Sequence, residues 1–374
     1  MTARYQAEKT NLILGFVPLL DAAPLIVAKE LGYFSAQGLT VQLQAERSWA
    51  SIRDKVAWGL LDGAQMLAPL PLASTLGLGS SAIPMVTGLV LSQGGNAISL
   101  SEALCQQLDL PPSLTGLTPA ELGARLRQHL QQSNRQLTLA TVSPYSCHHY
   151  QLHYWLQLSG IEPRQVNVIG LAPADMASQL DGGRIDGFCV GEPWNSLSQQ
   201  QGSSRILLSS EQLWPHCPEK VFAVTADFAS KQPQTHLALI TALLQACQWL
   251  ATPEAASGLT ALLAQPAYLP DLLQQMPAGP LLNPAIPQAF FGDELNFPWC
   301  SQAAWLQQQM RQLGQWQGPI DPQLLRQIYR TDLYRQAAAA LQLTAPASDW
   351  RLEGQQAPGF AGGEIFSIRN NASY

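Results

Sequence analysis

Charged residues are scarce in this sequence: Asp, Glu, Lys and Arg make up 12% of its 374 residues, and the net charge is −6. Only five residues are lysine, and the basic residues are scattered along the chain. Proteins that bind nucleic acid need a basic patch or stripe to meet the phosphates, so we expect no direct contact with RNA or DNA. Uninterrupted apolar runs of about 18 residues are also missing, which argues against a membrane-spanning helix.

Motifs for catalysis and metal binding are equally scarce. The six cysteines form no CxxC pair, which argues against a zinc site or a thioredoxin-like motif and favours reduced, structural thiols. No Gly-x-Ser-x-Gly elbow, Walker loop or dinucleotide-binding glycine pattern occurs between a strand and a helix. Cys147 and His148 are neighbours, but adjacent helical side chains point about 100° apart and do not share a proton. We therefore expect a protein that binds its ligand without turnover and without a cofactor.

The first residues make a poor secretory signal. A signal peptide has a basic start, an unbroken apolar stretch and a cleavage site of small residues. Here Glu8 lies among the basic residues, Gly15 and Pro18 interrupt the apolar stretch, and Asp21 follows it. We therefore expect the protein to stay in the cytosol and to sense a solute rather than import one.

Strand-like and helix-like segments alternate along the chain, which predicts an α/β layered fold with two lobes. We expect residues 1–100 plus 226–374 to form a discontinuous first lobe and residues 101–225 to form the second. Residues 354–374 are rich in Gly and polar side chains and are expected to be loosely attached. The predicted strands are residues 12–17, 39–43, 63–67, 136–142, 166–169, 187–190 and 222–225, and the predicted helices are residues 22–31, 49–59, 148–158, 174–180, 237–251, 302–313 and 324–343.

Two fragments repeat the same order of elements in the two lobes. Residues 58–69 and residues 181–193 each contain a helix that ends at glycine, a turn with Asp-Gly, and a short apolar strand that leads to a loop with proline. Ligands of open α/β sheets bind beyond the carboxyl ends of the strands. Two such lobes that face each other would form a cleft for the ligand, although Asp-Gly turns also occur in α/β proteins that have no such cleft.

Several residues at loop or helix starts could hold a small anion. Backbone N–H groups at a helix start have no intrahelical acceptor, so an anion binds there readily. His148 could donate to an oxyanion from the first turn of a helix; the alternative is a packed histidine. His148, His149 and His153 could suggest a metal, but no further ligand has suitable spacing, so we expect none. The predicted ligand-binding residues are Trp49, Asn96, His148, Gly191 and Lys220, with Gln65, Cys147 and Glu192 as further candidates.

Five segments resemble the nitrate- and bicarbonate-binding proteins of cyanobacterial-type ABC importers. The resemblance runs over nearly the whole chain, and the segments recur in order. It implies a type II periplasmic-binding fold whose two lobes close on one small oxyanion. By position it places the ligand contacts at Trp49, Asn96, His148, the loop that begins at Gly191, and Lys220. The segments are residues 15–24 (GFVPLLDAAP), 28–34 (AKELGYF), 48–55 (SWASIRDK), 62–69 (DGAQMLAP) and 296–299 (NFPW).

The sequence departs from that family at two of these positions. The resemblance implies a glutamine in nitrate-binding importer proteins where Asn96 stands, and usually a small hydroxyl residue where Cys147 stands. Nitrate accepts hydrogen bonds, donates none and needs one compensating cation, which Lys220 would supply. Bicarbonate carries a hydroxyl and needs an acceptor such as Glu192, but a carboxylate beside an anion repels it unless a metal intervenes. We therefore expect nitrate or nitrite as the ligand.

Together with the missing export signal, the resemblance implies a cytosolic nitrate or nitrite sensor of the NasS type. Such a sensor holds an RNA-binding antiterminator of the NasT type inactive, and lobe closure on the anion would release this partner. The alternatives are the substrate-binding component of a nitrate or bicarbonate ABC importer, or a regulatory domain that is normally fused to an ATPase. An enzyme of the thiamine-pyrimidine type shares this fold, but would need a cysteine cluster that the sequence does not contain.

Overall fold

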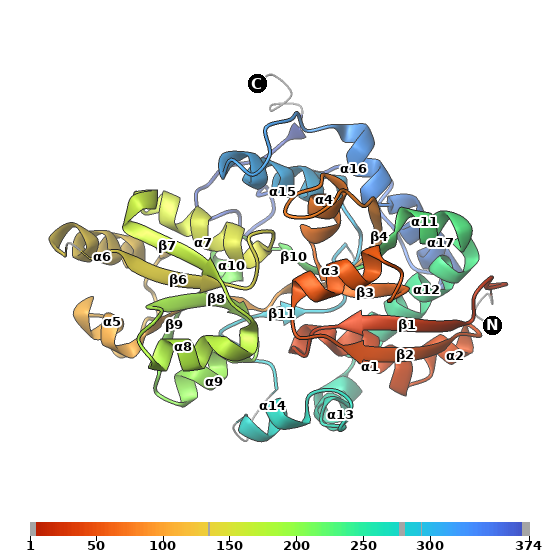
Figure 1. Cartoon of the computed structure of the whole chain (residues 1–374), viewed down its shortest axis with the longest axis horizontal. Coiled ribbons are helices and arrows are strands. Elements are labelled where there is room, and N and C mark those ends of the chain that lie inside the picture. The colour runs from red at the N-terminus through yellow and green to blue at the C-terminus, as the bar shows by residue number, and fades with distance from the viewer. Residues whose placement is uncertain (1–4, 134, 277–280, 293, 369–374) are drawn as a thin grey trace.

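The computed structural model describes residues 5–133, 135–276, 281–292 and 294–368. Within these residues the chain forms two α/β lobes that lie side by side, each built around its own β-sheet (Figure 1). The predicted two-lobed α/β fold is confirmed. None of the described helices is long and apolar enough to cross a lipid bilayer.

Each of the two sheets contains three neighbouring strands that pair in parallel. In the first sheet, with the order β11-β4-β10-β3-β1-β2, β1 pairs in parallel with β2 and β3; in the second, with the order β7-β6-β8-β5-β9, β6 pairs in parallel with β7 and β8. The two similar sequence fragments contain equivalent strands: residues 58–69 include β3, residues 181–193 include β8, and each of these strands pairs in parallel within its own sheet. The strands are β1 Asn11–Phe16, β2 Thr40–Ala45, β3 Gly63–Leu67, β4 Met85–Gly94, β5 Asn96–Ser101, β6 Leu137–Thr141, β7 Val166–Gly170, β8 Gly187–Gly191, β9 Ser204–Ser209, β10 Pro218–Thr225 and β11 Gln288–Ala289.

Helices pack around both sheets (Figure 1). In the first lobe they are η1 Leu20–Ala22, α1 Ala23–Glu30, α2 Tyr33–Ala36, α3 Trp49–Ala57, α4 Leu70–Thr75, α11 Ala226–Lys231, α12 Pro233–Leu250, α13 Pro253–Leu263, α14 Pro270–Gln275, α15 Cys300–Gln312, α16 Pro322–Ile328 and α17 Thr331–Ala340. In the second lobe they are α5 Glu102–Gln107, α6 Pro119–Gln132, α7 Cys147–Leu158, η2 Pro163–Gln165, η3 Pro173–Asp175, α8 Met176–Asp181, α9 Trp194–Gln200 and α10 Ser210–Leu213.

The chain passes between the sheets at Gly95, which separates β4 from β5, and again between β9 and β10. In β5, Ile98 pairs with Cys189 of β8, so this strand lies in the second sheet. In β10, Val221 pairs with Val90 of β4, so this strand lies in the first sheet. The predicted lobe boundaries after residues 100 and 225 would assign β5 to the first lobe and β10 to the second, and the strand pairing differs from them at both places.

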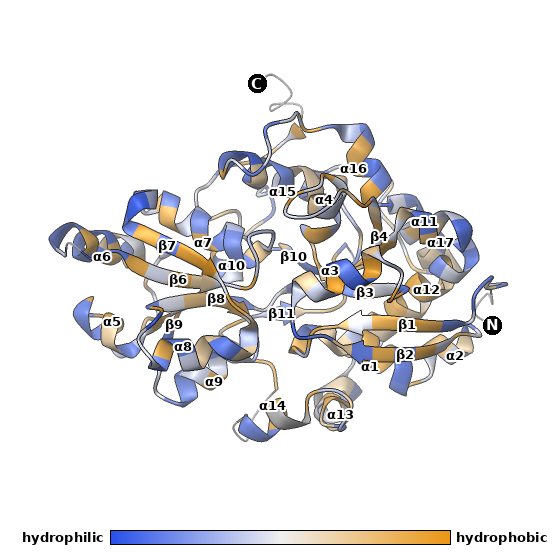
Figure 2. Cartoon of the chain, in the orientation of Figure 1, coloured by the Kyte–Doolittle hydropathy of each residue, from blue (hydrophilic) through white to orange (hydrophobic). Residues whose placement is uncertain are grey.

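Apolar side chains fill the interior of both lobes. Figure 2 shows hydrophobic residues along the strands and hydrophilic residues on the outer turns of the helices. Phe16 and Phe222 are fully buried in the first lobe, as are Leu139 and Trp155 in the second. Each buried side chain of this size stabilises the fold by about 1.5–3 kcal/mol relative to an exposed one. These cores fix the strand ends on which the polar residues between the lobes stand.

The C-terminal segment is attached more firmly than its composition predicts. The rings of Phe360 and Phe366 are buried and lie 4.9 Å and 5.2 Å from that of Trp305 on α15. The backbone N–H of Ala361 donates to the carbonyl oxygen of Leu213 on α10, at 3.0 Å. The expectation that residues 354–374 are loosely attached is therefore wrong up to residue 368; the remainder lies outside the described residues.

Residues 324–343 were expected to form one helix but form two. The chain leaves the helical path between α16 and α17, where the backbone N–H of Arg330 donates to the carbonyl oxygen of Thr87 on β4 at 2.8 Å. A hydrogen bond to the sheet thus replaces one within the helix.

Gly94, at the passage between the lobes, needs its missing side chain. Its φ is +69°, and a Cβ atom there would lie 2.3 Å from the carbonyl oxygen of Pro287. We expect Gly94→Ala to lower the free energy of unfolding by about 1–3 kcal/mol, measured by urea denaturation, because a backbone oxygen cannot easily move aside. Gly170→Ala is the control, since a Cβ atom at Gly170 meets nothing within 4 Å. Equal losses in the two variants would contradict this explanation.

Candidate functional site

A cluster of buried polar side chains lies between the two lobes. Each of them is at most 2% exposed. Burying polar groups costs free energy unless hydrogen bonds or ion pairs compensate for the lost water, so such a cluster marks a candidate site. We call it the inter-lobe cluster; it consists of Asp21, Trp49, Gln65, Glu219 and Lys220 from the first lobe and Asn96, His148 and Gln151 from the second, together with the backbone of Gly191 beside them.

Lys220 is the only cation of the inter-lobe cluster. It stands on β10, between β3 and β4, and its side chain is fully buried. Its Nζ lies 2.7 Å from Oδ2 of Asp21 and 2.5 Å from Oε1 of Glu219. The same Nζ lies 5.2 Å from the centre of the Trp49 ring, within the range of a cation–π contact. The ammonium group is therefore held by two carboxylates and an indole.

Local structure in the first lobe fixes the partners of Lys220. Ser48 caps the start of α3 with its side chain, which makes Trp49 the first residue of that helix. Gln65 lies on β3, donates its amide to Oδ1 of Asp21, and accepts the backbone N–H of Val17 at 3.1 Å. Asp21 follows β1 in a 3₁₀ turn, so it reaches the cluster from the carboxyl end of a strand, as expected for ligand sites of α/β sheets.

The second lobe adds Asn96 from β5 and two side chains from α7. Nδ2 of Asn96 donates to Oε1 of Gln151 at 3.1 Å and to Oε2 of Glu219 at 2.5 Å. Nε2 of His148 lies 3.3 Å from Oε1 of Glu219, but its geometry is not that of a hydrogen bond. Glu219 therefore bridges the two lobes.

Buried donors in this cluster lack acceptors. Nε1 of Trp49, Nε2 of Gln151 and both ring nitrogens of His148 have no hydrogen-bond partner among the described residues. Indole and amide N–H groups can only donate, and one nitrogen of a neutral imidazole must donate. Two acceptors of the cluster also lack a partner among the described residues: Oδ1 of Asn96 and the unprotonated nitrogen of the His148 ring. A group that accepts several hydrogen bonds would satisfy these donors.

The charges in the cluster do not balance. Burial holds the pKa of His148 well below its usual range, and the charge of Lys220 acts in the same direction, so the imidazole is neutral. Burial would lower the pKa of Lys220, but the charges of Asp21 and Glu219 outweigh it and raise that pKa, so the ammonium stays charged. With both carboxyls ionised, two negative charges and one positive charge leave a net charge of −1.

This excess negative charge bears on what the site can bind. Burial raises the pKa of Asp21, although the charge of Lys220 opposes the shift. At an effective dielectric constant of about 20, two like unit charges about 4 Å apart repel each other by about 4 kcal/mol. An anion in the cluster would meet one uncompensated carboxylate unless a proton neutralised it.

Gly191 brings the backbone of the second lobe close to the first. A Cβ atom on Gly191 would lie 3.5 Å from Oδ1 of Asn96 and 3.6 Å from Oδ2 of Asp21. The next residue, Glu192, accepts the backbone N–H of Leu20 through its carbonyl oxygen at 3.3 Å. The lobes therefore touch at the end of β8, directly beside the carboxylate of Asp21.

The structure brings the five principal predicted residues, Trp49, Asn96, His148, Gly191 and Lys220, into the inter-lobe cluster. Whether they bind a ligand stays a prediction. Gln65, one of the further candidates, contacts the cluster by donating its side-chain amide to Asp21. Cys147 points its thiol at the carbonyl oxygen of Pro218, 3.1 Å away, and burial raises its pKa, so it fits a structural role.

The carboxylate of Glu192 contacts α9. Its carboxylate accepts the hydroxyl and, at 3.3 Å, the backbone N–H of Ser196, which lie on α9. Whether Glu192 meets a ligand hydroxyl stays a prediction. The carboxylates that do lie in the cluster are those of Asp21 and Glu219.

Asp21, Glu219 and Gln151 were missed from the sequence. Gln151 had a usable signal, because it follows His148 by three residues and lies on the same side of α7. Asp21 follows the first strand, in the position from which ligands are usually contacted.

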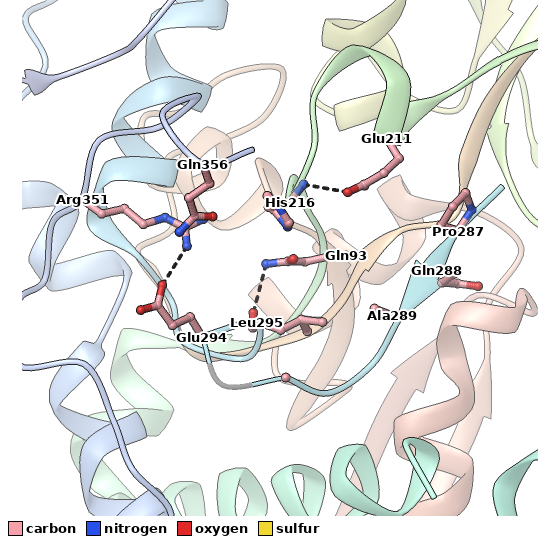
Figure 3. A pocket seen from close by; sticks show the side chains of 11 residues that line it. Gln93, Glu211, His216, Pro287, Gln288, Ala289, Glu294, Leu295, Arg351 and Gln356 are labelled. Carbon is pink, nitrogen blue, oxygen red and sulfur yellow. Dashed lines mark hydrogen bonds and ion pairs between the residues drawn. The ribbon is translucent and has the colours of Figure 1, made fainter. Parts of the chain in front are cut away.

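A second candidate is the cavity of about 480 Å³ beside the passage between the lobes (Figure 3). Figure 3 shows Arg351 paired with Glu294, at 3.2 Å, and Gln93 donating to the carbonyl oxygen of Leu295. The guanidinium of this cavity is thus already neutralised by a carboxylate. The inter-lobe cluster, with its unpartnered donors, is the stronger candidate for an anion site.

Metal ligation has little support in the described part of the chain. No group of three or more His, Cys, Asp or Glu side chains there is arranged to hold a metal ion. The rings of His149 and His153 lie 4.4 Å apart, whereas His148 faces the inter-lobe cluster. Burial lowers the pKa of His149 to about 3, so it carries no charge.

Comparison with known proteins gives one family and several close relatives. The sequence profile of the NMT1-like family matches residues 5–264. The chain is 30% identical to the nitrate/nitrite binding protein NrtA of Synechococcus elongatus, over 92% of this chain and 81% of that protein. The crystal structure of the periplasmic nitrate-binding protein NrtA from Synechocystis PCC 6803 matches with a TM-score of 0.86 and 27% identity, over 98% of this chain and 97% of that one.

Longer proteins match as well. The chain is 38% identical to the nitrate import ATP-binding protein NrtC and 37% identical to the bicarbonate transport ATP-binding protein CmpC, both of Synechocystis. These alignments cover 89% and 91% of this chain, but 51% of each relative. The chain thus spans about half the length of these ATP-binding relatives.

Proposed function

The chain belongs to the NMT1-like family, and from this premise we propose that it binds nitrate or nitrite in the inter-lobe cluster. The observation that carries the proposal is the set of buried donors without acceptors, on Trp49, His148 and Gln151, around the ammonium of Lys220. Nitrate and nitrite accept hydrogen bonds and donate none, which matches such a set. The names of the NrtA relatives, which bind nitrate, support the same ligand.

We propose binding without turnover. The thiol nearest to the cluster, on Cys147, donates to a backbone carbonyl, and burial raises its pKa, so little reactive thiolate forms. The imidazole of His148 is neutral and close to a carboxylate, but no hydroxyl or thiol nucleophile among the described residues is hydrogen-bonded to it.

The test is isothermal titration of the dialysed protein with nitrate, nitrite and bicarbonate in turn. We expect micromolar binding of nitrate or nitrite, because a small anion that meets several charged or dipolar donors gains a few kcal/mol from each. Binding of bicarbonate alone, or of none of the three anions, would overturn the proposed ligand.

Trp49→Phe tests the donor role of the indole separately from its packing. We expect the affinity for nitrate to fall about tenfold or more, because a hydrogen bond to a charged group contributes about 1.5–3 kcal/mol. Trp305→Phe is the matched control, because Trp305 is also buried with an unpartnered Nε1 but lies outside the inter-lobe cluster. Both variants should lose about 1–2 kcal/mol of stability through the smaller ring. Unchanged nitrate affinity in Trp49→Phe would remove the indole from the proposed site.

The finer proposal is that the protein is a cytosolic sensor that releases an RNA-binding antiterminator of the NasT type when the anion binds. Ligand binding can release a partner only if the ligand prefers the closed lobes over the partner-bound state, and the coupling is reciprocal. The partner must therefore weaken nitrate binding by the same factor by which nitrate weakens partner binding. Equal nitrate affinity with and without the antiterminator would contradict the sensor proposal.

The second candidate is the ligand-binding part of a nitrate or bicarbonate importer. It is favoured by the alignments with NrtC and CmpC, whose names are those of transport ATP-binding proteins. Chemical cross-linking in cells, followed by identification of the captured chains, separates the two candidates. An antiterminator that is released by nitrate supports the sensor, whereas ATP-binding and membrane components support the importer.

A further inference from the structure

The proposed anion site carries more negative charge than an anion-binding site needs. Lys220 is flanked by Asp21 and Glu219 at 2.7 Å and 2.5 Å, and all three side chains are at most 2% exposed. Water is excluded, so these charges are screened only by one another and by fixed dipoles. Nitrate cannot donate a hydrogen bond to a carboxylate, so the second carboxylate would face it as a bare negative charge.

We propose that the site takes up one proton with each nitrate or nitrite, and that the carboxyl of Asp21 receives it. The inference rests on the proposed function, because it concerns the same ligand. On binding, a proton from the solvent joins an oxygen of the Asp21 carboxylate; the resulting carboxyl donates to the anion, and Lys220 keeps its charge opposite Glu219. The net charge of the cluster with its ligand thus stays at −1 instead of reaching −2.

Geometry selects Asp21 rather than Glu219 as the acceptor of the proton. Glu219 accepts from Asn96 of the second lobe at 2.5 Å and from Lys220 at 2.5 Å, whereas both donors to Asp21, Gln65 and Lys220, belong to the first lobe. The second lobe therefore supplies a donor to Glu219 and none to Asp21. Oδ2 of Asp21 faces the second lobe, 3.6 Å from where a Cβ atom of Gly191 would lie. An anion held between the lobes would therefore meet this oxygen.

The surroundings of Asp21 leave few other groups that could take the proton. Burial raises the pKa of Asp21, which is the direction that favours a proton on this carboxylate when an anion is added. The neighbouring strands β3 and β8 bring Gln65 and Gly191, which do not titrate. The titratable groups beside the cluster on the packed elements are Lys220 and Glu219 on β10, Cys217 directly before β10, His148 and Cys147 on α7, and Cys189 on β8.

The proton makes the affinity depend on pH in a defined direction. A bound anion disfavours the carboxylate, so the pKa of Asp21 is higher with ligand than without it. Nitrate affinity is then greatest below the pKa of the free site and is lost as the pH rises through the pKa of the bound site. Between the two values, linkage predicts that the dissociation constant rises about tenfold per pH unit.

The experiment is titration calorimetry with nitrate in buffers of different ionisation enthalpy, from about pH 5.5 to about pH 8.5, a range that lies above the reference pKa of Asp. We expect uptake of one proton per nitrate in the wild-type protein. In Asp21→Asn the uptake should vanish, and the nitrate affinity should vary by less than about twofold across this range. Glu46→Gln is the control, because Glu46 is a buried carboxylate of the same lobe that pairs with Lys55 outside the cluster; it should behave as the wild type.

The outcomes separate this inference from the proposed function. Nitrate binding without proton uptake would overturn the inference and leave the proposed function in place, whereas no nitrate binding at any pH would overturn both. Uptake that persists in Asp21→Asn would overturn the assignment to Asp21. If that variant does not fold, Glu219→Gln serves instead: by removing the other carboxylate charge it should abolish the need for a proton, and a full proton taken up with nitrate in Glu219→Gln would overturn the charge argument.

Discussion

Replacing Lys220 by methionine is expected to abolish nitrate binding, with an affinity at least about a hundredfold lower, because the anion loses its only cation and a charge-assisted hydrogen bond. The same change should lower the free energy of unfolding at neutral pH by about 3–5 kcal/mol, because Asp21 and Glu219 stay buried without a counter-charge. Titration calorimetry measures the first effect and urea denaturation the second.

The lysine control and a double variant make this expectation specific. Lys55→Met removes a lysine that lies 2.5 Å from Glu46 but is 32% exposed, so it should cost at most about 1 kcal/mol and leave nitrate binding intact. The double variant Lys220→Met with Asp21→Asn removes one charge of each sign and should recover much of the lost stability. It should not recover nitrate binding. Nitrate affinity close to the wild type in either Lys220 variant would exclude Lys220 as the anion's counter-charge.

The sequence predicts the two lobes and many of their elements, and its failures have physical reasons. The strand at residues 63–67 and the helix at 148–158 match β3 and α7 closely because turn signals mark one end of each, an Asp-Gly turn before β3 and Gly160 after α7. β4, Met85–Gly94, was missed because all its residues are buried, so it shows no alternation of apolar and polar side chains. The lobe assignment of β5 and β10 depends on long-range pairing, which no local pattern encodes.

The candidate site could also be predicted from the sequence only in part. His148 could be proposed because it stands at the start of a predicted helix, and the family resemblance placed Lys220 in the same site. The electrostatic character of the site could not be proposed, because it depends on contacts between residues that are distant in sequence. Asn96 and Glu219 are 123 positions apart. Lys220, on the strand β10, pairs with Asp21, which follows the first strand of the chain. A carboxylate next to a lysine in sequence gives no indication that both are buried.

Gly191→Leu should reduce nitrate affinity at least about a hundredfold, because binding between two lobes requires them to close and the new side chain would stand where they meet. A Cβ atom alone fits at Gly191: its nearest contacts would be 3.4 Å from the Leu19 side chain, 3.5 Å from Asn96 and 3.6 Å from Asp21. The branched part of a leucine has no such space, since these three groups already surround the Cβ position. Gly191→Ala should therefore bind nitrate with nearly normal affinity, and the loss should grow with side-chain size.

Small-angle scattering on the same variants tests whether closure is the cause. We expect the wild-type protein to become more compact when nitrate is added, and Gly191→Leu to keep the larger radius of gyration at every nitrate concentration. Gly170→Leu is the matched control, because Gly170 also ends a strand of the second lobe but meets nothing within 4 Å. If the lobes of Gly191→Leu closed normally and the variant still failed to bind nitrate, the leucine would be displacing the anion itself. The end of β8 would then contact the ligand directly and would not be only a surface at which the two lobes meet.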